Sequence, residues 1–257
     1  MAYVDTFERK EIKHVLDSQQ YLAMLQAIAP HMCLDTYGKS TITSLYYDTP
    51  TWDLIERSLD KPLYKEKLRV RTYGNQSTAK TPAFVELKKK YQGIVYKRRI
   101  CMTQQGAKAY LDDMPYTQAC KQYPHSDSTQ QDASLDAKSM QIAREIDHFK
   151  DFYQPLTPSI AIRVERSAWA PIEGTHEDFA TDNLRITFDE DMYYLNTRTH
   201  KHNYRQLVDS GMCIMEVKAL GAIPRWLVDA LNIANIKPSS FSKYGRAYTL
   251  ERSKQAC

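Results

Sequence analysis

An alternation of apolar and polar residues with a period of two runs through most of the chain and predicts a fold made mainly of strands. Leu68 and Val70, for example, each lie between two basic residues. Successive side chains of a strand point to opposite faces, so such a segment has one apolar and one charged face. The predicted strands are Phe7–Leu16, Thr41–Tyr47, Leu63–Tyr73, Ala83–Lys90, Ile94–Met102, Pro158–Trp169, Leu184–Phe188, Met192–Leu195 and Cys213–Ala219.

A helical period marks fewer segments, and these do not alternate regularly with the strands. A parallel, doubly wound sheet needs a crossover helix between successive strands. The pattern therefore predicts an α+β fold, mainly antiparallel, in which a sheet or barrel carries helices on its outside. We expect residues 1–257 to form one domain, with a flexible insertion near 123–140, where Ser, Gln and Asp are frequent, and a short polar tail at the end. The predicted helices are Ser18–Ala29, Trp52–Ser58, Gln104–Met114, Ala143–Phe152 and Pro224–Ala234.

Several predicted strands carry charged residues at every second position, so that the charges share one face. In a closed barrel one face of every strand points into the lumen. Such faces would make a charged lumen, which requires water and an anionic ligand inside. The alternative is a solvated outer face, although such faces usually mix signs and contain Ser, Thr and Gln. The charged faces are Arg9, Glu11 and Lys13; Lys67, Arg69 and Arg71; Glu86, Lys88 and Lys90; Lys97 and Arg99; Arg185, Thr187 and Asp189; and Glu216 and Lys218.

Positive charge is concentrated in Lys61–Arg99, where twelve Lys or Arg residues accompany only two acids, Glu66 and Glu86. Such a concentration indicates an anionic partner. A linear triphosphate or polyphosphate fits, because Arg offers a planar fork to phosphate oxygens and Lys a point charge. Glu216 stands in an otherwise apolar segment and is a candidate ligand for Mg²⁺ or Mn²⁺ beside the phosphates.

Other signatures of chemistry are missing from the sequence. It contains no GxxxxGK[ST], GxGxxG, GxSxG or HExxH motif, so nucleotide recognition would depend on side chains. Five scattered cysteines without a CxxC pair, and an N-terminus without an apolar signal region, predict a reducing, cytoplasmic location. The run Lys88–Lys90 leaves a nucleic-acid patch open, but few aromatic residues alternate with basic ones, so no nucleic-acid partner is predicted.

Nine short motifs occur in order along most of the chain, each of them weak alone. They are Arg9-x-Glu11-x-Lys13, Ser44-Leu-Tyr-Tyr-Asp48-Thr, Lys67-Leu-Arg69-Val-Arg71-Thr-Tyr73-Gly74, Val85-Glu86-Leu-Lys88-Lys, Tyr96-Lys97-Arg-Arg99, Arg166-Ser-Ala168-Trp169, Leu184-Arg185-Ile-Thr187-Phe-Asp189, Met215-Glu216-Val-Lys218 and Phe241-Ser-Lys243-Tyr. Through them the chain resembles the polyphosphate polymerase domain of the vacuolar transporter chaperone (VTC) family, within the triphosphate tunnel metalloenzyme (CYTH-like) superfamily.

The resemblance implies an eight-stranded, tunnel-like antiparallel β-barrel that binds ATP and a growing polyphosphate chain. Its implied catalytic residues are Lys88, Arg69, Arg71 and Glu216, with Glu216 also the ligand of a Mn²⁺ or Mg²⁺ ion. The superfamily's ExExK opening is here Arg9-x-Glu11-x-Lys13, and one fewer carboxylate fits the polymerase branch better than the triphosphatase branch. The predicted phosphate-binding residues are Lys13, Arg69, Arg71, Lys88, Lys97, Arg99, Arg166, Arg185, Lys218 and Lys243.

The predicted function is transfer of the γ-phosphoryl group of ATP to polyphosphate. This chemistry needs positioning and charge neutralisation but no protein nucleophile. Two alternatives stay open: metal-dependent hydrolysis of triphosphate or polyphosphate in the same tunnel, and binding of polyphosphate without catalysis. The chain shows neither the regulatory SPX domain nor the membrane helices that accompany this domain in eukaryotic complexes, so any membrane partner is expected to be a separate polypeptide.

Overall fold

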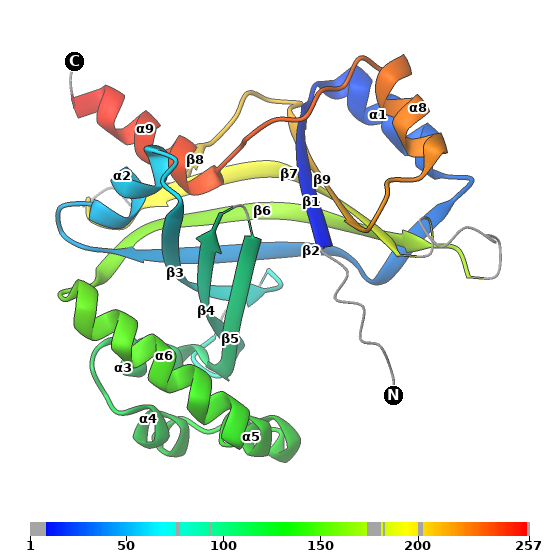
Figure 1. The fold of residues 1–257 in the computed structure, drawn as a ribbon. Coiled ribbons are helices and arrows are strands. Elements are labelled where there is room, and N and C mark those ends of the chain that lie inside the picture. Colours follow the sequence, from blue (N-terminus) through cyan, green and yellow to red (C-terminus); the bar gives the residue numbers. More distant parts are fainter. Residues whose placement is uncertain are drawn as a thin grey trace. The chain divides into compact units, whose positions relative to one another are not determined.

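The chain forms strands and helices largely where its periodicity predicts them (Figure 1). The computed structural model describes residues 9–75, 78–92, 94–173, 181, 183–199 and 203–255. The strands are β1 (Arg9–Leu16), β2 (Met32–Asp48), β3 (Tyr64–Tyr73), β4 (Pro82–Tyr91), β5 (Ile94–Thr103), β6 (Thr157–Pro171), β7 (Leu184–Asn196), β8 (Arg205–Gln206) and β9 (Cys213–Leu220). The helices are α1 (Ser18–Ile28), α2 (Asp53–Leu59), α3 (Gln104–Leu111), α4 (Tyr116–Gln122), α5 (Ser128–Ser134), α6 (Ala137–Tyr153), α8 (Arg225–Ile233) and α9 (Lys243–Gln255).

The strands of the described residues belong to one nine-stranded sheet in the order β1-β9-β7-β6-β2-β3-β4-β5, with β8 beside β7. The registers of β1 with β9, β9 with β7, and β2 through β5 are all antiparallel. The predicted α+β, mainly antiparallel class is therefore confirmed. Within the described ranges no pairing joins β5 back to β1. The sheet is open in this structure, so the closed, eight-stranded barrel expected from the sequence is not confirmed.

The chain divides into two compact units. Unit 1 comprises Met1–Thr41, Val164–Tyr193 and Gln206–Ser242, and unit 2 comprises Ile42–Arg163, Tyr194–Arg205 and Lys243–Cys257. The strands β2, β6 and β7 each have one end in either unit. Neither unit is thus a continuous piece of chain, and no linker of the kind that separates consecutive domains divides them.

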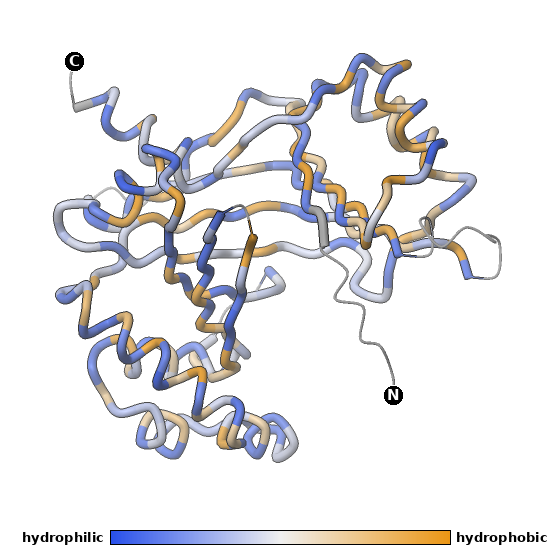
Figure 2. Tube along the Cα trace, in the orientation of Figure 1, coloured by the Kyte–Doolittle hydropathy of each residue, from blue (hydrophilic) through white to orange (hydrophobic). Residues whose placement is uncertain are grey.

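Each unit has its own hydrophobic core, formed by one face of its strands together with helices (Figure 2). In unit 2, Leu68, Val85 and Ile100 of β3, β4 and β5 are buried with side chains from α3, α4 and α6. In unit 1, Ile186 of β7 and Val217 of β9 are buried with side chains from α1 and α8. Burial of these faces drives folding. The prediction that the apolar strand faces lie under helices is confirmed.

Several elements differ from the sequence prediction. The strand β2 begins at Met32 rather than at Thr41, and α4 and β8 were not predicted. The strand β7 is continuous where two strands were expected, because it runs through the acidic residues 189–191. In the stretch 123–140, expected to lack regular structure, the helix α5 forms with the Asp127 side chain accepting from two backbone N–H groups as its N-cap. The helix α9 replaces the expected polar tail. None of the described helices is both long and apolar enough to cross a membrane.

Candidate functional site

The charged face of unit 2 lies on β2, β3, β4 and β5, opposite the face that enters the core. Antiparallel registers place its residues in rows that cross the strands. Five predicted phosphate-binding residues, Arg69, Arg71, Lys88, Lys97 and Arg99, come together here. The rows are Lys67, Lys88 and Lys97; then Tyr46, Arg69, Glu86 and Arg99; then Ser44, Arg71 and Phe84.

Glu86 is the one carboxylate in these rows of described residues, and only 1% of its side chain is exposed. Arg69 donates from Nε to Glu86 Oε2 at 2.8 Å, and its Nη2 lies 2.6 Å from the same oxygen. Lys97 Nζ lies 2.5 Å from Glu86 Oε1, while Arg71 Nε lies 3.9 Å from Oε2. A single buried negative charge thus holds three cations in place and cannot neutralise them.

The pKa values of this cluster show the same shortage of negative charge. Burial alone would raise the pKa of Glu86, but Arg69, Arg71 and Lys97 outweigh it and hold that pKa at about 2. Burial lowers the pKa of Lys97 despite the attraction of Glu86. Burial, and then repulsion from Arg69, lowers the pKa of Arg71. Cations whose charged form is disfavoured in this way have too few counter-charges.

Tyr46 completes the environment of Arg69. Its hydroxyl accepts a hydrogen bond from Arg69 Nη1 at 3.1 Å, so the guanidinium is held between this phenol and Glu86. Burial raises the pKa of Tyr46, but the charges of Arg69, Lys67 and Arg71 outweigh it and bring that pKa down to about 7. A phenol that ionises near neutral pH marks a strongly positive potential at this face.

Tyr244, at the start of α9, packs directly on this cluster. Its ring stacks on Tyr46 with centroids 4.4 Å apart, and Lys67 Nζ lies 5.9 Å from the centre of the Tyr244 ring. The Tyr244 hydroxyl donates to Asp48 Oδ2 at 2.6 Å, and Asp48 also accepts from two backbone N–H groups of α2. The first turn of α9 is therefore part of the wall behind the cations. The predicted ligand Lys243 is the residue that precedes Tyr244 and is half-buried.

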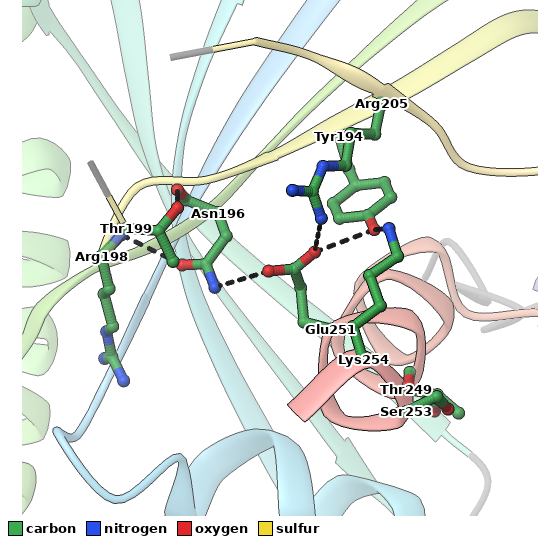
Figure 3. A network of polar contacts seen from close by, with 9 residues as sticks. All are labelled: Tyr194, Asn196, Arg198, Thr199, Arg205, Thr249, Glu251, Ser253 and Lys254. Atoms are coloured by element: carbon green, nitrogen blue, oxygen red, sulfur yellow. Dashed lines mark hydrogen bonds and ion pairs between the residues drawn. The ribbon is translucent and has the colours of Figure 1, made fainter. Parts of the chain in front are cut away.

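The far end of α9 is fixed by a second polar network (Figure 3). The carboxylate of Glu251 accepts from Tyr194 Oη at 3.0 Å, from Asn196 Nδ2 at 3.0 Å and from Arg205 Nη1 at 2.8 Å. Lys254 adds a longer contact of 3.4 Å to the Tyr194 hydroxyl. Held at both ends, α9 keeps Tyr244 and Lys243 in a fixed register beside the cationic rows.

Unit 1 has a second charged face, on β1, β9 and β7, opposite its own core. Its two rows are Lys13, Glu216 and Thr187, and then Glu11, Lys218 and Arg185. Lys218 Nζ lies 3.3 Å from Glu216 Oε1, and Lys13 Nζ lies 3.7 Å from Glu11 Oε1. This face therefore mixes positive and negative side chains, unlike the face of unit 2.

Glu216 is the most buried acid of the two rows of unit 1. Burial raises its pKa, but Lys218, a hydrogen bond with the carboxyl group of Glu11, and the charges of Lys13 and Arg166 outweigh burial and bring the pKa to about 2. The structure thus brings Lys13, Lys218 and Arg166, all predicted phosphate ligands, into the electrostatic environment of the predicted metal ligand. It also adds Glu11 as a second carboxylate beside Glu216.

The carboxylates around Glu216 could bind a divalent cation only together with ligands that the protein does not supply. Among the residues that the structure describes, no group of three or more His, Cys, Asp or Glu side chains could hold a metal ion by itself. Mg²⁺ is commonly bound by one or two carboxylates together with phosphate oxygens and water, and Mn²⁺ accepts the same oxygen donors. Glu11 and Glu216 fit this mode, in which the ligand's phosphates complete the coordination.

Two further predicted ligands are already paired with acids. Arg166 binds Asp189 through two contacts, Nε to Oδ1 at 2.5 Å and Nη2 to Oδ2 at 2.7 Å. Asp189 is almost fully buried, so this is a fixed fork-to-carboxylate pair. Arg185 pairs with Asp35 and lies 6.0 Å from the centre of the Tyr37 ring. An added anion could therefore contact Arg166 or Arg185 only if that guanidinium also kept its contact with the carboxylate.

The sequence pattern gave no organising role to Glu86, Tyr46 or Asp189, although these residues hold the cations of the two faces in place. Glu86 and Asp189 were assigned to the charged faces by their parity, but their partners lie on other strands. Tyr46 was visible only as part of the Ser44-to-Asp48 motif. The sequence did contain a signal for the role of Glu86. Glu86 and Glu66 are the only acids among the basic residues of Lys61–Arg99.

Comparison with known proteins places the chain in a family. A protein from Hippeastrum, described as an adenylyl cyclase with a dominant triphosphatase activity, has a similar fold, with a TM-score of 0.52 and 15% identity over 92% of this chain and 94% of that one. An adenylate cyclase-like structure from Bacillus halodurans aligns with a TM-score of 0.44 and 11% identity over 91% and 95% of the two chains. No curated protein sequence matches the chain. The sequence model of the VTC domain matches residues 8–251, nearly the whole chain, and the chain therefore belongs to the VTC domain family.

Proposed function

We propose that the chain is an ATP-dependent polyphosphate polymerase that transfers the γ-phosphoryl group of ATP to the end of a polyphosphate chain. The observation that carries the proposal is the column of cationic rows on the charged face of unit 2. The rows that contain Lys67 and Arg69 continue toward the start of β3 with a further pair, Lys65 opposite Lys90. They continue in the other direction to Arg71.

The length of this column favours a chain-like anion. From Lys65 to Arg71 the strand advances six residues, about 20 Å at the usual rise of a strand. Cations recur at every second residue over that length, and Glu86 is the one acid in the rows of described residues. A triphosphate fills part of such a column, whereas a longer polyphosphate chain fills all of it. The cationic column therefore supports polyphosphate as substrate or product, with ATP as the phosphoryl donor.

The proposed reaction needs only positioning and charge compensation from the protein. A terminal phosphate oxygen of the acceptor forms a bond to the γ-phosphorus, the bond from that phosphorus to the β,γ-bridging oxygen breaks, and ADP leaves. Arg69 and Arg71 would bind the equatorial oxygens, and Lys88 and Lys97 the bridging side of the chain. Glu86 and Tyr46 act through Arg69, because they fix the orientation of its guanidinium.

A divalent ion, Mn²⁺ or Mg²⁺, would be held by Glu216 with Glu11 and would supply charge neutralisation of the phosphates. Lys13 and Lys218, which contact these two carboxylates, would bind phosphate oxygens beside it. The sequence predicts that this chemistry takes place inside a cationic tunnel. That enclosure remains a prediction, since the sheet is open among the described residues.

Hydrolysis is the second candidate, because the Hippeastrum protein of similar fold is described as having a dominant triphosphatase activity. It uses the same cations but water as acceptor, so only the product distinguishes it from polymerisation. A polyphosphate-binding module without turnover is the third. The test incubates purified chain with ATP and Mn²⁺ and analyses the products by gel. Long polyphosphate with ADP supports the polymerase, phosphate with ADP supports the hydrolase, and binding without ADP supports the module.

A matched pair of lysines ties the activity to the column. Lys88 lies on the charged face, whereas Lys89, the next residue, points to the other face and pairs with Glu66 at 3.5 Å. Lys88→Ala should reduce product formation at least about a hundredfold, because a preorganised cation is lost. Lys89→Ala should leave it within about twofold of wild type. Equal losses of product formation in both variants would contradict the proposal that the cationic column binds the substrate.

A further inference from the structure

The end of the β4–β5 hairpin in unit 2 exposes apolar side chains that the proposed reaction does not use. Figure 2 shows the first residues of β5 as hydrophobic. Three aliphatic side chains, which are usually buried, are largely exposed here: 72% of Leu63, 45% of Ile94 and 41% of Val95. Three tyrosines, Tyr64, Tyr91 and Tyr96, are between 42% and 49% exposed beside them. These six residues, the hairpin patch, lie at the end of the hairpin on both faces of its strands, and exposed apolar side chains gathered in this way mark an interaction site.

The strand registers order the hairpin patch along the strand direction. Gln92, in the turn, donates its backbone N–H to the carbonyl of Leu63, so Leu63 lies at the tip. The next row contains Tyr64, Tyr91 and Ile94, and the Tyr64 and Tyr91 rings meet edge to face at 6.5 Å. The row behind contains Lys65, Lys90 and Val95. Leu63, Tyr64, Tyr91 and Ile94 thus lie nearest the tip, and the lysines stand one row behind them together with Val95.

The lysines around the hairpin patch repel one another. Lys65 and Lys90 are directly opposite across β3 and β4, an arrangement that destabilises a sheet. Burial, then the charges of Lys90 and Lys61, lowers the pKa of Lys65. The neighbouring acid Glu66 is buried and already bound by Lys89 and by the Tyr153 hydroxyl at 3.1 Å. The positive charge at this end therefore lacks a counter-charge within the strands that carry it.

We propose that the hairpin patch docks on a membrane surface rich in anionic lipid. Aliphatic side chains at the tip would enter the boundary of the acyl chains, the tyrosines would lie at the interface, and Lys61, Lys65 and Lys90 would reach headgroup phosphates. Tyrosine and lysine occupy these levels at membrane interfaces, and each lysine near an anionic surface adds to the attraction. The inference does not depend on the proposed enzymatic function.

Two observations favour lipid over a second protein. Leu63 and Ile94 lie at the tip of a hairpin, and the tip of a hairpin enters a soft surface more readily than it matches a flat one. The charge around them is of one sign, apart from the exposed Asp60 and the buried Glu66. A protein interface of this size usually mixes apolar contacts with paired charges and hydrogen bonds. A second copy of this chain would bring the same positive charge to the contact.

The test is co-sedimentation of the full chain with vesicles of phosphatidylcholine alone or of phosphatidylcholine with phosphatidylglycerol. Every sample contains saturating inorganic triphosphate, so that the part of the cationic column around Arg69 and Arg71 is occupied and cannot bind lipid phosphate, while Lys65 and Lys90 at the other end of the column stay available. We expect binding to the anionic vesicles only, weakened by salt. The double variant Ile94→Glu/Val95→Glu should lose at least about tenfold in vesicle affinity. Lys61→Gln should lose about fivefold.

A matched control and a milder variant keep the result unambiguous. Ile233, at the end of α8 in unit 1, is 87% exposed and outside the hairpin patch, so Ile233→Glu should bind vesicles like wild type. If the double glutamate variant does not fold, Ile94→Ser/Val95→Ser removes the same apolar contact without adding charge. Undiminished vesicle binding by these variants, or equal binding to both vesicle types, overturns the proposal. So does a wild-type dimer that becomes monomeric in the serine variant, because the hairpin patch then covers a second copy.

Discussion

The two charged faces of this molecule are built on the same plan and differ in their balance of charge. In both units one face of an antiparallel sheet is buried under helices and the other is lined with ionisable side chains. On the face of unit 2 the rows of described residues hold eight cations and one carboxylate: Lys65, Lys67, Arg69, Arg71, Lys88, Lys90, Lys97, Arg99 and Glu86. In unit 1 four cations of the described residues each contact an acid: Lys13, Arg166, Arg185 and Lys218 contact Glu11, Asp189, Asp35 and Glu216.

This difference assigns different work to the two faces. A partly buried face with excess positive charge is incomplete without an outside anion, because desolvated cations are costly when unpaired. The face of unit 2 is therefore the better candidate for the polyanion itself. The balanced face of unit 1 has no such need, but its paired carboxyl groups can hold a cation that arrives with the phosphates. The charge balance of the face of unit 2 thus suits an anionic chain, and that of the face of unit 1 suits a divalent cation.

The largest expected effect comes from removing Arg69. Arg69→Ala deletes a guanidinium that is 16% exposed and held on two sides, and leaves Glu86 to repel phosphate. Turnover of ATP and affinity for inorganic triphosphate should fall about a thousandfold. The matched control is Arg98→Ala on β5 of the same sheet, since Arg98 points to the opposite face and pairs with Glu145 at 3.3 Å. Similar losses in both variants, measured by ADP release and by calorimetry, would break the distinction between the two faces of the sheet.

Glu216→Gln should cause the next largest loss of turnover, and it should do so only in reactions that contain a divalent metal ion. Turnover with Mn²⁺ should fall about a hundredfold, because charge neutralisation of the phosphates is lost. Affinity for triphosphate without metal should stay the same or increase, since a negative charge is removed. Mn²⁺ binding followed by electron paramagnetic resonance gives a readout that is independent of turnover.

Glu190→Gln is the control for Glu216→Gln, because Glu190 lies on β7, the neighbour of β9 in unit 1, but its carboxylate accepts a hydrogen bond from the Tyr21 hydroxyl at 2.8 Å. It should leave Mn²⁺ binding and turnover unchanged. If Glu216→Gln weakens triphosphate binding in the absence of metal, the carboxylate has a structural rather than a metal-binding role.

Glu86→Gln should act on stability more than on chemistry. The variant leaves Arg69, Arg71 and Lys97 without their buried counter-charge, which should lower the free energy of unfolding by about 3 kcal/mol. Inorganic triphosphate should restore more stability to the variant than it adds to wild type, because it replaces the missing anion. Thermal unfolding with and without triphosphate measures both effects. Equal stabilisation of the two proteins would show that the ligand does not bind these cations.

The pH dependence of this difference has a defined sign. The pKa of Glu86 is lowered from 4.5 to about 2, so its contribution to stability is fully present above pH 4.5. It is lost as the pH falls from there through about 2. The gap in unfolding free energy between wild type and Glu86→Gln should therefore be constant at neutral pH and should close only in acid.

The charged faces could be predicted from sequence because they depend on local geometry alone. The positions of Lys67, Arg69 and Arg71 at every second residue fix their common face whatever strand lies beside them. The burial of Leu68 and Val70 on the other face is confirmed by the core of unit 2. The pairing partners could not be predicted, since the row that joins Arg69 to Glu86 depends on the register between strands distant in sequence.

The helix α9 shows a second limit of sequence reasoning. Its residues, KYGRAYTLERSKQ, carry polar groups on every side and give little amphipathic signal. The helix forms because of contacts made elsewhere in unit 2: the stacking of Tyr244 on Tyr46 and the acceptance of three hydrogen bonds by Glu251. Neither contact has a signature in the local pattern, so the segment was expected to be a tail.

The smallest effect, and the sharpest comparison of the two units, concerns two tyrosines. The pKa of Tyr46 in unit 2 is lowered to about 7, because Arg69, Lys67 and Arg71 outweigh its burial. In unit 1, burial and then the hydrogen bond and charge of Glu190 raise the pKa of Tyr21. Near-ultraviolet absorbance should therefore show one tyrosinate forming near pH 7 in wild type and none in Tyr46→Phe. The stability that this ionisation adds appears as the pH rises above about 7 and is lost below it.

Binding of a polyanion should reverse the shift of Tyr46. Negative charge beside Arg69 and Lys67 cancels the potential that favours the phenolate, so saturating inorganic triphosphate should move the midpoint upward by at least about one pH unit. Tyr21→Phe serves as the control and should change neither the neutral transition nor its response to triphosphate. Turnover by Tyr46→Phe should fall only a few-fold, since Glu86 still holds Arg69. A midpoint that stays near 7 with triphosphate bound would mean that the anion occupies the balanced face of unit 1 instead.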